Sequence, residues 1–567
     1  MKRILLLGFL ALQLSCKTTP TTEASHETII GVTAEHAMVV SAREEASKIG
    51  LSIIRSGGNA FDAMIATEMA LAVVYPFAGN LGGGGFMVYR KADGEIGALD
   101  YREKAPMKAT RDMYLTETGE VDQDRSRIGG LAVGVPGTVA GIFAVHEKFG
   151  SLPMEEILAP VIQLANNGFV ITENQRKNFE GYRDLFLEVN KDTILFALPY
   201  QPGDTIRNKA LAATLRDLSS PGGREVFYKG EIALKIVNHI QENGGIITSE
   251  DMAGYEAVWR EPVVFHYRDH NIISMSPPSS GGIVLAQIMK MAEPFPLKEF
   301  GHNSLRTIQV LTEAERRAYA DRSYFLGDPD FVEIPTPFLT SVEYLHNRMK
   351  DFSFDRATPS SEIDHGYVPG YEHMETTHYS IVDNQGNAVS VTTTLNGAYG
   401  SKLYVPELGF FLNNEMDDFS AKPGVPNMFG LIGAEANAIE PGKRMLSSMT
   451  PTIVEKDGKF LMAVGSPGGS TIITSVLQTI LNVVEFDMGM QEAVTAPRFH
   501  HQWLPDEIVF EPASFNQKLL ESLRSKNYEV NERNSRILGK VDAILRLDNG
   551  LLEGGADPRG DDAAAGF

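Results

Sequence analysis

Residues 375–380, Glu375-Thr376-Thr377-His378-Tyr379-Ser380, are the most informative stretch of this chain. They follow a segment, 360–375, whose richness in Ser, Asp, His, Gly, Pro and Glu is typical of a loop, and they lead into a strand-like run. Thr376 therefore stands where a loop becomes a strand. A Thr at the start of a chain has an α-amino group with a pKa near ~8, which can take the proton of its own hydroxyl. Cleavage before Thr376 would create a nucleophile and its base together; without cleavage, the pattern is an ordinary loop-to-strand boundary.

A β-hairpin is predicted directly after this stretch, with its turn at 383–387. If Gln385 is the centre of the turn, the antiparallel register places Thr394 opposite Thr376, unless a Gly bulge shifts it by one residue. Side chains on one face of a strand are two residues apart, so Asn396 is expected on the same face as Thr394. A hydroxyl and an amide would thus converge on Thr376.

A second hairpin, 450–465, runs into a Gly-rich segment and then into a helical pattern at 471–485. Gly468 and Gly469 precede the helix, where backbone N–H groups are free and the helix dipole is positive. This arrangement suits a developing oxyanion. The alternative is a turn that needs glycine for its conformation, with Ser470 as the helix N-cap.

Five motifs, taken together, resemble those of the γ-glutamyltransferases, the glutathione-cleaving branch of the N-terminal nucleophile hydrolases. They are TTHYS at 376–380, LNNEMDDF at 412–419, LSSM at 446–449, GSPGG at 465–469 and PRFHH at 497–501. The resemblance extends over residues 31–567. It implies an α+β fold, a four-layer αββα sandwich that two fragments of one precursor build jointly. The large subunit would span 31–375 and the small subunit 376–567, with the catalytic Thr at its start.

The resemblance also implies catalytic roles. Thr376 is similar to the nucleophile that self-cleavage of the Glu375–Thr376 bond releases. Thr394 is similar to the Thr that hydrogen-bonds the new amino terminus. Gly468 and Gly469 resemble the glycines of the oxyanion hole.

A γ-glutamyl group is a zwitterion, and the resemblance implies separate ligands for its two charges. The residues that resemble the α-ammonium ligands are Asn396, Glu415 and Asp418, and those that resemble the α-carboxylate ligands are Ser447, Ser448 and Arg102. The chemistry is suitable, because Arg forms bidentate contacts with carboxylates and the acidic groups supply negative charge. Without the family, Arg102 beside Glu103 would be interpreted as a solvated ion pair.

One residue departs from the family pattern. Bacterial members often carry a Tyr in a lid loop after the second motif, and here that residue is Phe429. The loop is rich in Pro and Gly, as expected of a partly mobile lid. The missing hydroxyl would remove one hydrogen bond of lid closure without affecting the chemistry.

The implied activity is cleavage of the γ-glutamyl amide of glutathione and its conjugates through an acyl-enzyme, with transfer to water, amino acids or dipeptides. No cofactor or metal is expected, because His500 and His501 are adjacent and no metal-binding motif accompanies them. The alternatives are a cephalosporin or glutaryl acylase, a polyglutamate-processing relative, and an inactive envelope binding protein. An acylase needs no ammonium ligands, so Asn396, Glu415 and Asp418 favour the γ-glutamyl substrate.

The composition of the chain argues against nucleic-acid-binding and membrane-surface-binding proteins. The chain has 567 residues, of which 43% are hydrophobic, enough for a large core. Its net charge of −22 argues against a nucleic-acid partner and against electrostatic binding to a membrane. Length alone would suggest several domains, but the only break that resembles a linker is 360–375.

The N-terminus resembles a bacterial lipoprotein signal. Lys2 and Arg3 precede a short apolar segment, and the only cysteine, Cys16, follows it. Gln13 departs from the aliphatic residue usual three positions before the cysteine, and ordinary signal cleavage without a lipid is the alternative. We therefore expect a signal peptide at 1–15, a polar tether at 16–30, and export to the periplasm or cell envelope of a bacterium. A single cysteine allows no intramolecular disulfide.

Further elements are predicted from local patterns. Two helices are expected at 41–54 and 60–74, separated by a Gly-Gly C-cap. The four glycines at 82–85 lack the Lys-Ser/Thr of a phosphate-binding loop and precede a strand, so we expect close backbone packing near the site. Residues 313–322 are predicted to form a helix with a charged face.

Overall fold

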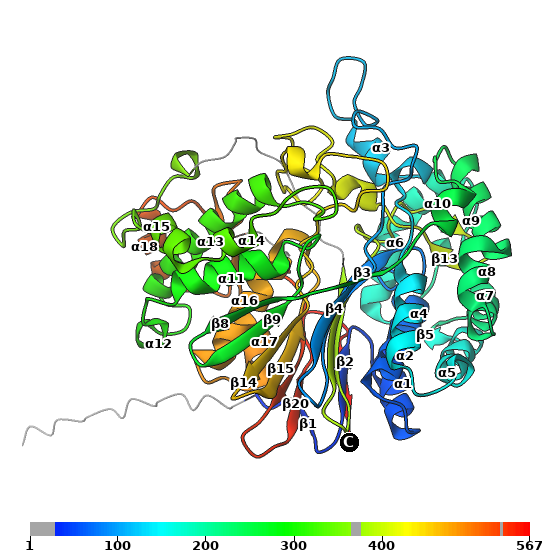
Figure 1. Cartoon of the computed structure of the whole chain (residues 1–567), viewed down its shortest axis with the longest axis horizontal. Coiled ribbons are helices and arrows are strands. Elements are labelled where there is room, and N and C mark those ends of the chain that lie inside the picture. The colour runs from blue at the N-terminus through cyan, green and yellow to red at the C-terminus, as the bar shows by residue number, and fades with distance from the viewer. Residues whose placement is uncertain (1–28, 364–375, 533–536) are drawn as a thin grey trace, which may run out of the picture.

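Two seven-stranded antiparallel sheets stack face to face in the middle of the computed structural model (Figure 1). The structure describes residues 29–363, 376–532 and 537–567. The first sheet has the order β21 (Ala563–Gly566), β2 (Met38–Ser41), β10 (Thr377–Val382), β11 (Ala388–Thr394), β3 (Gly84–Arg90), β4 (Ile96–Asp100) and β7 (Val258–Arg260). The second has the order β1 (Val32–Ala34), β20 (Leu552–Gly555), β19 (Asp542–Arg546), β15 (Lys459–Gly465), β14 (Thr452–Lys456), β9 (His270–Ser274) and β8 (Val263–Tyr267).

Helices cover the outer face of each sheet (Figure 1). Those on the side of the first sheet are α1 (Glu44–Arg55), α2 (Ala60–Val74), α4 (Thr138–Phe149), α5 (Met154–Asn167), α6 (Glu173–Asn190), α7 (Lys209–Ser219), α8 (Gly223–Lys229) and α9 (Glu231–Glu242). Those on the side of the second are α11 (Gly281–Ala292), α13 (Leu305–Phe325), α16 (Ile472–Val484) and α17 (Met490–Thr495). This arrangement confirms the predicted α+β class and the four-layer αββα sandwich.

Shorter elements complete the molecule. The remaining helices are α3 (Gln123–Arg127), α10 (Ser249–Ala253), α12 (Leu297–Phe300), α14 (Thr336–Leu339), α15 (Val342–Arg348) and α18 (Gln517–Arg524). The small sheets pair β5 (Phe169–Val170) with β6 (Thr205–Ile206), β12 (Tyr404–Val405) with β13 (Phe410–Phe411), and β16 (Phe499–His500) with β17 (Ile508–Phe510) and β18 (Val530–Glu532). Over the described ranges, no helix has the length and apolarity needed to cross a membrane.

Residues on both sides of position 376 build each sheet. In the first sheet, β10 and β11 lie between β2 and β3, which come from much earlier in the chain. In the second, β14 and β15 lie between β9 and β19. The two halves of the chain therefore share one fold, as predicted. Glu375, Cys16, the signal segment 1–15 and most of the 16–30 tether lie outside the described residues.

The strands of the first sheet are buried on both faces. In β2, Val39 belongs to the core under the helices, whereas Val40 belongs to the core between the sheets. Every residue of β10 and β11 is buried as well. Polar residues such as His378 and Ser380 are therefore fully enclosed, and each makes hydrogen bonds within the protein.

The local predictions near the N-terminus are confirmed except for one boundary. The helix predicted at 41–54 is α1 and begins at Glu44, because Ser41 is the last residue of β2. The helix predicted at 60–74 is α2, and Asn59 caps it by accepting hydrogen bonds from the N–H groups of Phe61 and Asp62. The glycines at 82–85 pack tightly, as expected. A Cβ at Gly83 would lie 2.1 Å from the carbonyl oxygen of Thr394, at the end of the hairpin strand.

The charged helix predicted at 313–322 is part of α13, but its charges are buried instead of solvated. Arg316 and Arg317 are each 1% exposed. Arg317 forms an ion pair with Glu313 at 2.6 Å, and Glu313 is itself buried. Oppositely charged side chains that pair along a helix compensate each other's charge when they are buried. A charged sequence pattern alone therefore does not distinguish a solvated helix face from a buried one.

Candidate active site

The predicted hairpin register is confirmed. The pairing of β10 with β11 runs without a bulge from Val382 opposite Ala388 to Thr377 opposite Thr393. The next pair outward is therefore Thr376 and Thr394. Thr376 is 5% exposed and lies immediately before β10.

The turn of this hairpin is anchored to the helical layer. The carboxylate of Asp383 accepts hydrogen bonds from the N–H groups of Gln385 and Asn387, both at 2.9 Å. It also accepts one from the N–H of Ala60 at the start of α2, again at 2.9 Å. One side chain thus sets the turn and also binds the positive end of a helix. The position of the strand that follows Thr376 is fixed at its far end.

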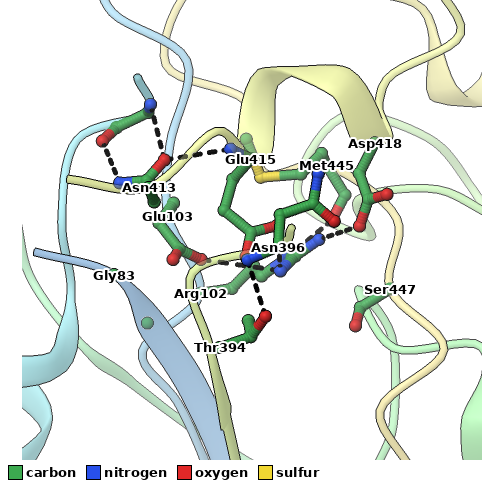
Figure 2. A network of polar contacts seen from close by, with 12 residues as sticks. Gly83, Arg102, Glu103, Thr394, Asn396, Asn413, Glu415, Asp418, Met445 and Ser447 are labelled. Carbon is green, nitrogen blue, oxygen red and sulfur yellow. Dashed lines mark hydrogen bonds and ion pairs between the residues drawn. The ribbon is translucent and has the colours of Figure 1, made fainter. Parts of the chain in front are cut away.

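The strand continuation predicted for Asn396 is wrong. Strand β11 ends at Thr394, and Asn396 has a left-handed backbone with φ 72°. Its N–H donates to the hydroxyl of Thr394 at 2.7 Å (Figure 2). Its amide nitrogen donates to the carbonyl of Asn414 at 3.0 Å. Asn tolerates this conformation better than most residues. The tight turn still keeps Asn396 beside Thr394, but through a local hydrogen bond instead of strand alternation.

Gly468 and Gly469 form a sharp turn between β15 and the short helix Gly469–Thr471 that leads into α16. Their φ angles are 138° and 54°, which favour glycine. The carbonyl of Gly468 accepts hydrogen bonds from the N–H and the hydroxyl of Thr471. Ser470 is not the N-cap of α16, because Thr471 occupies that position. The turn and the helix start together lie where an oxyanion hole was predicted.

Phe429 covers this turn. Its ring lies so close to Gly469 that a Cβ on the glycine would be 2.4 Å from ring atom Cδ1. The residues before Phe429 bind the predicted ammonium ligands: Asn427 donates to Asp418 Oδ1 at 2.9 Å, and the sulfur of Met428 lies 3.6 Å from the amide nitrogen of Asn396. The segment around Phe429 therefore touches both the oxyanion turn and the predicted ammonium site.

Arg102 lies between two acidic side chains (Figure 2). Its guanidinium forms ion pairs at 2.5 Å with Glu415 Oε2 and at 2.5 Å with Asp418 Oδ2, and Glu103 lies 3.6 Å away. Nε also donates to the carbonyl of Met445 at 3.3 Å. Taken in isolation, Arg102 and Glu103 would be interpreted as a solvated ion pair. That interpretation is wrong, because both side chains are buried.

Burial makes this acidic cluster receptive to a cation. It raises the pKa of Glu103 to about 8 and that of Asp418 to about 6, against the opposing charge of Arg102. Burial also raises the pKa of Glu415 well above its usual range. Three carboxyl groups share one neighbouring guanidinium, so they bind protons more tightly than free carboxylates do. An ammonium group placed among them would supply the missing positive charge.

A small cavity brings the predicted residues together. Its volume is about 20 Å³, close to the space of one water molecule. Its lining comprises Arg102, Arg322, Thr376, Thr394, Asp418, Phe429, Leu431, Ser447, Ser448, Met449, Gly469 and Ile472. Of the other predicted residues, Glu415 contacts Arg102, Asn396 contacts Thr394, and Gly468 directly precedes Gly469.

Two residues of α13 form hydrogen bonds to the site and were not predicted from the sequence. Tyr319 donates its hydroxyl to the carbonyl of Ser470 at 2.5 Å, directly after the glycine turn. Arg322 donates to the hydroxyl of Ser448 at 3.1 Å. The available signal was their i, i+3 spacing, which places both on one face of the helix. That signal was hidden among the other charges of α13.

The two adjacent histidines are held by protein groups. His500 contacts the hydroxyl of Thr474 at 2.8 Å, and His501 contacts Asp506 at 3.3 Å. Burial lowers the pKa of His501 to about 4. Among the described residues, no three His, Cys, Asp or Glu side chains form a group that could hold a metal ion.

Comparison with known proteins identifies the family. The family model described as gamma-glutamyltranspeptidase matches residues 46–567. The chain belongs to the γ-glutamyltranspeptidase family. It is 46% identical over 541 residues to the glutathione hydrolase proenzyme of Escherichia coli strain K12, covering 94% of this chain and 93% of that protein. It is 48% identical to the enzyme of the same name from Pseudomonas sp. strain A14, covering 87% of each.

A solved structure supports the fold of this γ-glutamyltranspeptidase family member. The crystal structure of cephalosporin acylase from Bacillus halodurans matches with a TM-score of 0.85 at 25% sequence identity. The match covers 97% of this chain and 99% of that one. The family thus shares its architecture with an acylase. The fold alone therefore does not identify the substrate, which must be inferred from the residues of the site.

Proposed function

We propose that this chain is a self-processing γ-glutamyltransferase that cleaves the γ-glutamyl amide of glutathione and its conjugates. The observation that carries the proposal is the single cavity where Thr376, the Gly469 turn, the Arg102–Asp418 pair and the two serines meet. These groups supply a nucleophile, oxyanion donors and ligands for both charges of a γ-glutamyl group. The relatives named glutathione hydrolase proenzyme match nearly the whole chain and support the same activity.

Processing precedes catalysis in this proposal. The hydroxyl of Thr376 attacks the carbonyl carbon of Glu375, and the acyl group moves from the nitrogen of Thr376 to its oxygen. Water then cleaves the ester, which leaves a carboxylate on Glu375 and a free amine on Thr376. The product is a heterodimer of a large and a small subunit, held together by sheets to which both contribute.

Catalysis uses the new amine as the base. It takes the proton of the Thr376 hydroxyl while the oxygen attacks the γ-carbonyl carbon. N–H groups of Gly468 and Gly469 stabilise the oxyanion. The amine then passes the proton to the leaving amine, and the γ-glutamyl group remains as an ester on Thr376. Water releases glutamate, or an amino acid or dipeptide forms a new γ-glutamyl amide.

The acidic cluster distinguishes this substrate from that of an acylase. In the proposal, Asn396, Glu415 and Asp418 bind the α-ammonium, and Ser447, Ser448 and Arg102 bind the α-carboxylate. A glutaryl group has no ammonium, so it would leave the buried carboxyl groups near Arg102 without a second cation. The cluster therefore favours γ-glutamyl over glutaryl donors.

One assay tests the proposal. The purified, processed chain is given γ-glutamyl-p-nitroanilide and glutaryl-p-nitroanilide, each with and without a dipeptide acceptor. We expect release of nitroaniline from the γ-glutamyl compound, faster with the dipeptide, and much slower release from the glutaryl compound. A preference for the glutaryl compound would make the chain an acylase. Binding of γ-glutamyl ligands without turnover would make it an inactive binding protein.

The cellular location of the chain is proposed separately from its activity. The positive N-terminus, the short apolar segment and Cys16 support export to a bacterial envelope, with a lipid on Cys16. Cys16→Ser should then move the enzyme from the membrane fraction to the soluble periplasmic fraction. Wild-type protein that is already soluble and incorporates no fatty acid would leave simple secretion as the explanation.

A further inference from the structure

Arg322 is a buried cation at the cavity that contains Thr376. It is 3% exposed and belongs to the cavity lining. The polar partners of its guanidinium are hydroxyls: Nε donates to Ser280 at 2.9 Å and Nη2 donates to Ser448 at 3.1 Å. Within the described ranges, no carboxylate forms an ion pair with it. Arg102 differs, because its guanidinium already binds Glu415 and Asp418.

The contact with Arg322 determines the role of the Ser448 hydroxyl. A hydroxyl has one proton to donate and two lone pairs. Because a guanidinium can only donate, Ser448 must accept in this contact. The Ser447 hydroxyl also accepts, from the N–H of Met449 at 3.1 Å. Neither hydroxyl donates to another described residue, so both have a proton to offer to an acceptor in the cavity.

Arg322 supports Ser447 as well, through Ser280. The Ser280 hydroxyl accepts from Arg322 Nε and donates to the carbonyl of Ser447 at 2.7 Å. The N–H of Ser280 donates to the same carbonyl at 2.8 Å. One guanidinium on α13 thus holds the Ser447–Ser448 segment at two points.

The charge of Arg322 suits an anionic ligand. Burial lowers the pKa of its guanidinium to about 10, so the group remains charged near neutral pH. Enclosing a cation without an ion pair is costly unless a ligand or neighbouring dipoles compensate it. The hydrogen-bond partners that face it here are two serine hydroxyls, while Tyr319 and Asp418 exert weaker electrostatic attraction. An anion bound to Ser447 and Ser448 would meet two hydroxyl protons and a nearby positive charge.

We propose that Arg322 is a positioning residue for the α-carboxylate of the γ-glutamyl donor. It holds the Ser447–Ser448 segment, makes the Ser448 hydroxyl a hydrogen-bond donor, and places a positive charge behind it. Arg102 also binds this carboxylate in the proposed function, and its pairs with Glu415 and Asp418 place it beside the ammonium ligands. This inference rests on the proposed function, because it assigns one charge of that substrate.

Two donors that differ only in the α-carboxylate test the inference. They are γ-glutamyl-p-nitroanilide and 4-aminobutanoyl-p-nitroanilide, each measured as substrate and as competitive inhibitor. For Arg322→Met, we expect kcat/KM for the γ-glutamyl compound to fall about tenfold or more, mainly through KM. The constants for the compound without the carboxylate should change less than threefold. Ser448→Ala should shift the ratio between the two donors in the same direction.

Arg317→Met is the matched control. Arg317 is a buried arginine on the same helix, but it pairs with Glu313 and Asp351 outside the cavity. We expect this variant to be less stable, with an unchanged ratio between the two donors.

An equal loss for both donors in Arg322→Met, or no loss, would overturn the proposed role. If Arg322→Met does not fold, Arg322→Lys decides by the same ratio, since it keeps the charge but loses the paired contacts. A wild-type enzyme inactive on γ-glutamyl anilide would instead refute the proposed function.

Discussion

The ring of Phe429 lies directly against the backbone of Gly469. A Cβ on Gly469 would come within 2.4 Å of the ring, and its φ of 54° independently favours glycine. The segment that covers the site thus packs on the turn assigned to the oxyanion. Phe429 also belongs to the lining of the small cavity that contains Thr376. Movement of this segment would therefore expose the oxyanion turn.

Gly469→Ala should therefore be nearly inactive. The methyl group displaces either Phe429 or the turn, and loss of one oxyanion donor costs roughly 100- to 1,000-fold in kcat. Gly458→Ala is the control, because Gly458 also has a positive φ, 71°, but has open space around its Cβ position. Steady-state kinetics on the γ-glutamyl anilide compare the two variants. Equal activities would show that contact with Phe429 and the oxyanion turn does not matter.

Phe429→Tyr should shift turnover from hydrolysis toward transfer. The Tyr hydroxyl adds a hydrogen bond across the site, worth roughly 0.5–1.5 kcal/mol, so the closed population rises several-fold at most. A more closed lid admits less water to the acyl-enzyme. Glutamate release and γ-glutamyl-dipeptide formation are measured for both proteins. An unchanged ratio would mean that the contacts of Asn427 and Met428 already control closure.

Thr376→Ala should remain a single chain of about full length on a denaturing gel, because the attacking hydroxyl is absent. Thr376→Ser retains a hydroxyl and should still be cleaved, although at a different rate. Thr377→Ala is the neighbouring control: Thr377 is buried in β10, directly after the proposed cleavage point. Two fragments from Thr376→Ala would rule out self-cleavage by this residue.

Arg102→Ala should raise KM for the γ-glutamyl donor about ten- to a hundred-fold, as expected for a lost charge-assisted contact of roughly 1.5–3 kcal/mol. It also leaves Glu103, Glu415 and Asp418 without their main cation, so Tm should fall. Adding Glu415→Gln should recover part of the Tm but not KM. An unchanged KM in the single variant would remove Arg102 from the substrate site.

Glu68→Gln should flatten the dependence of stability on pH. Glu68 is fully buried on α2 and accepts a hydrogen bond from the hydroxyl of Tyr379 at 2.6 Å. Burial raises its pKa from 4.5 to about 7. Between these values the unfolded chain binds fewer protons, so wild-type stability falls as pH rises, and the loss levels off above pH 7. The difference is on the order of 3 kcal/mol.

Urea unfolding at several pH values between 4.5 and 8 measures this effect. Glu44→Gln is the control, because that side chain is 64% exposed and forms only a surface pair with Lys48. It should follow the wild-type curve. Parallel curves for Glu68→Gln and wild type would show that Glu68 does not bind its proton more tightly in the folded state.

Much of the site could be predicted because its residues are close in sequence or constrained by local geometry. The Thr376–Thr394 pairing follows from the turn at Gln385, since an antiparallel hairpin without a bulge has one register for a given turn centre. The glycine turn at 468–469 follows from backbone conformations that other residues adopt poorly. The link from Arg102 to Glu415 came only through resemblance to the family, since local patterns do not relate positions so far apart.

The remaining features depend on tertiary contacts. A helix of charged residues can be solvated or enclosed, and only packing against α11, α12 and α18 decided that α13 is buried. Asn396 leaves the strand because a hydrogen bond to Thr394 and a contact with Asn414 stabilise a left-handed turn. Arg322 reaches Ser448 from 126 residues away. The sequence by itself determined the nucleophile hairpin and the glycine turn, because backbone geometry acts locally. The environment of each buried charge was decided only by the folded structure, because burial and pairing depend on residues that sequence order does not bring together.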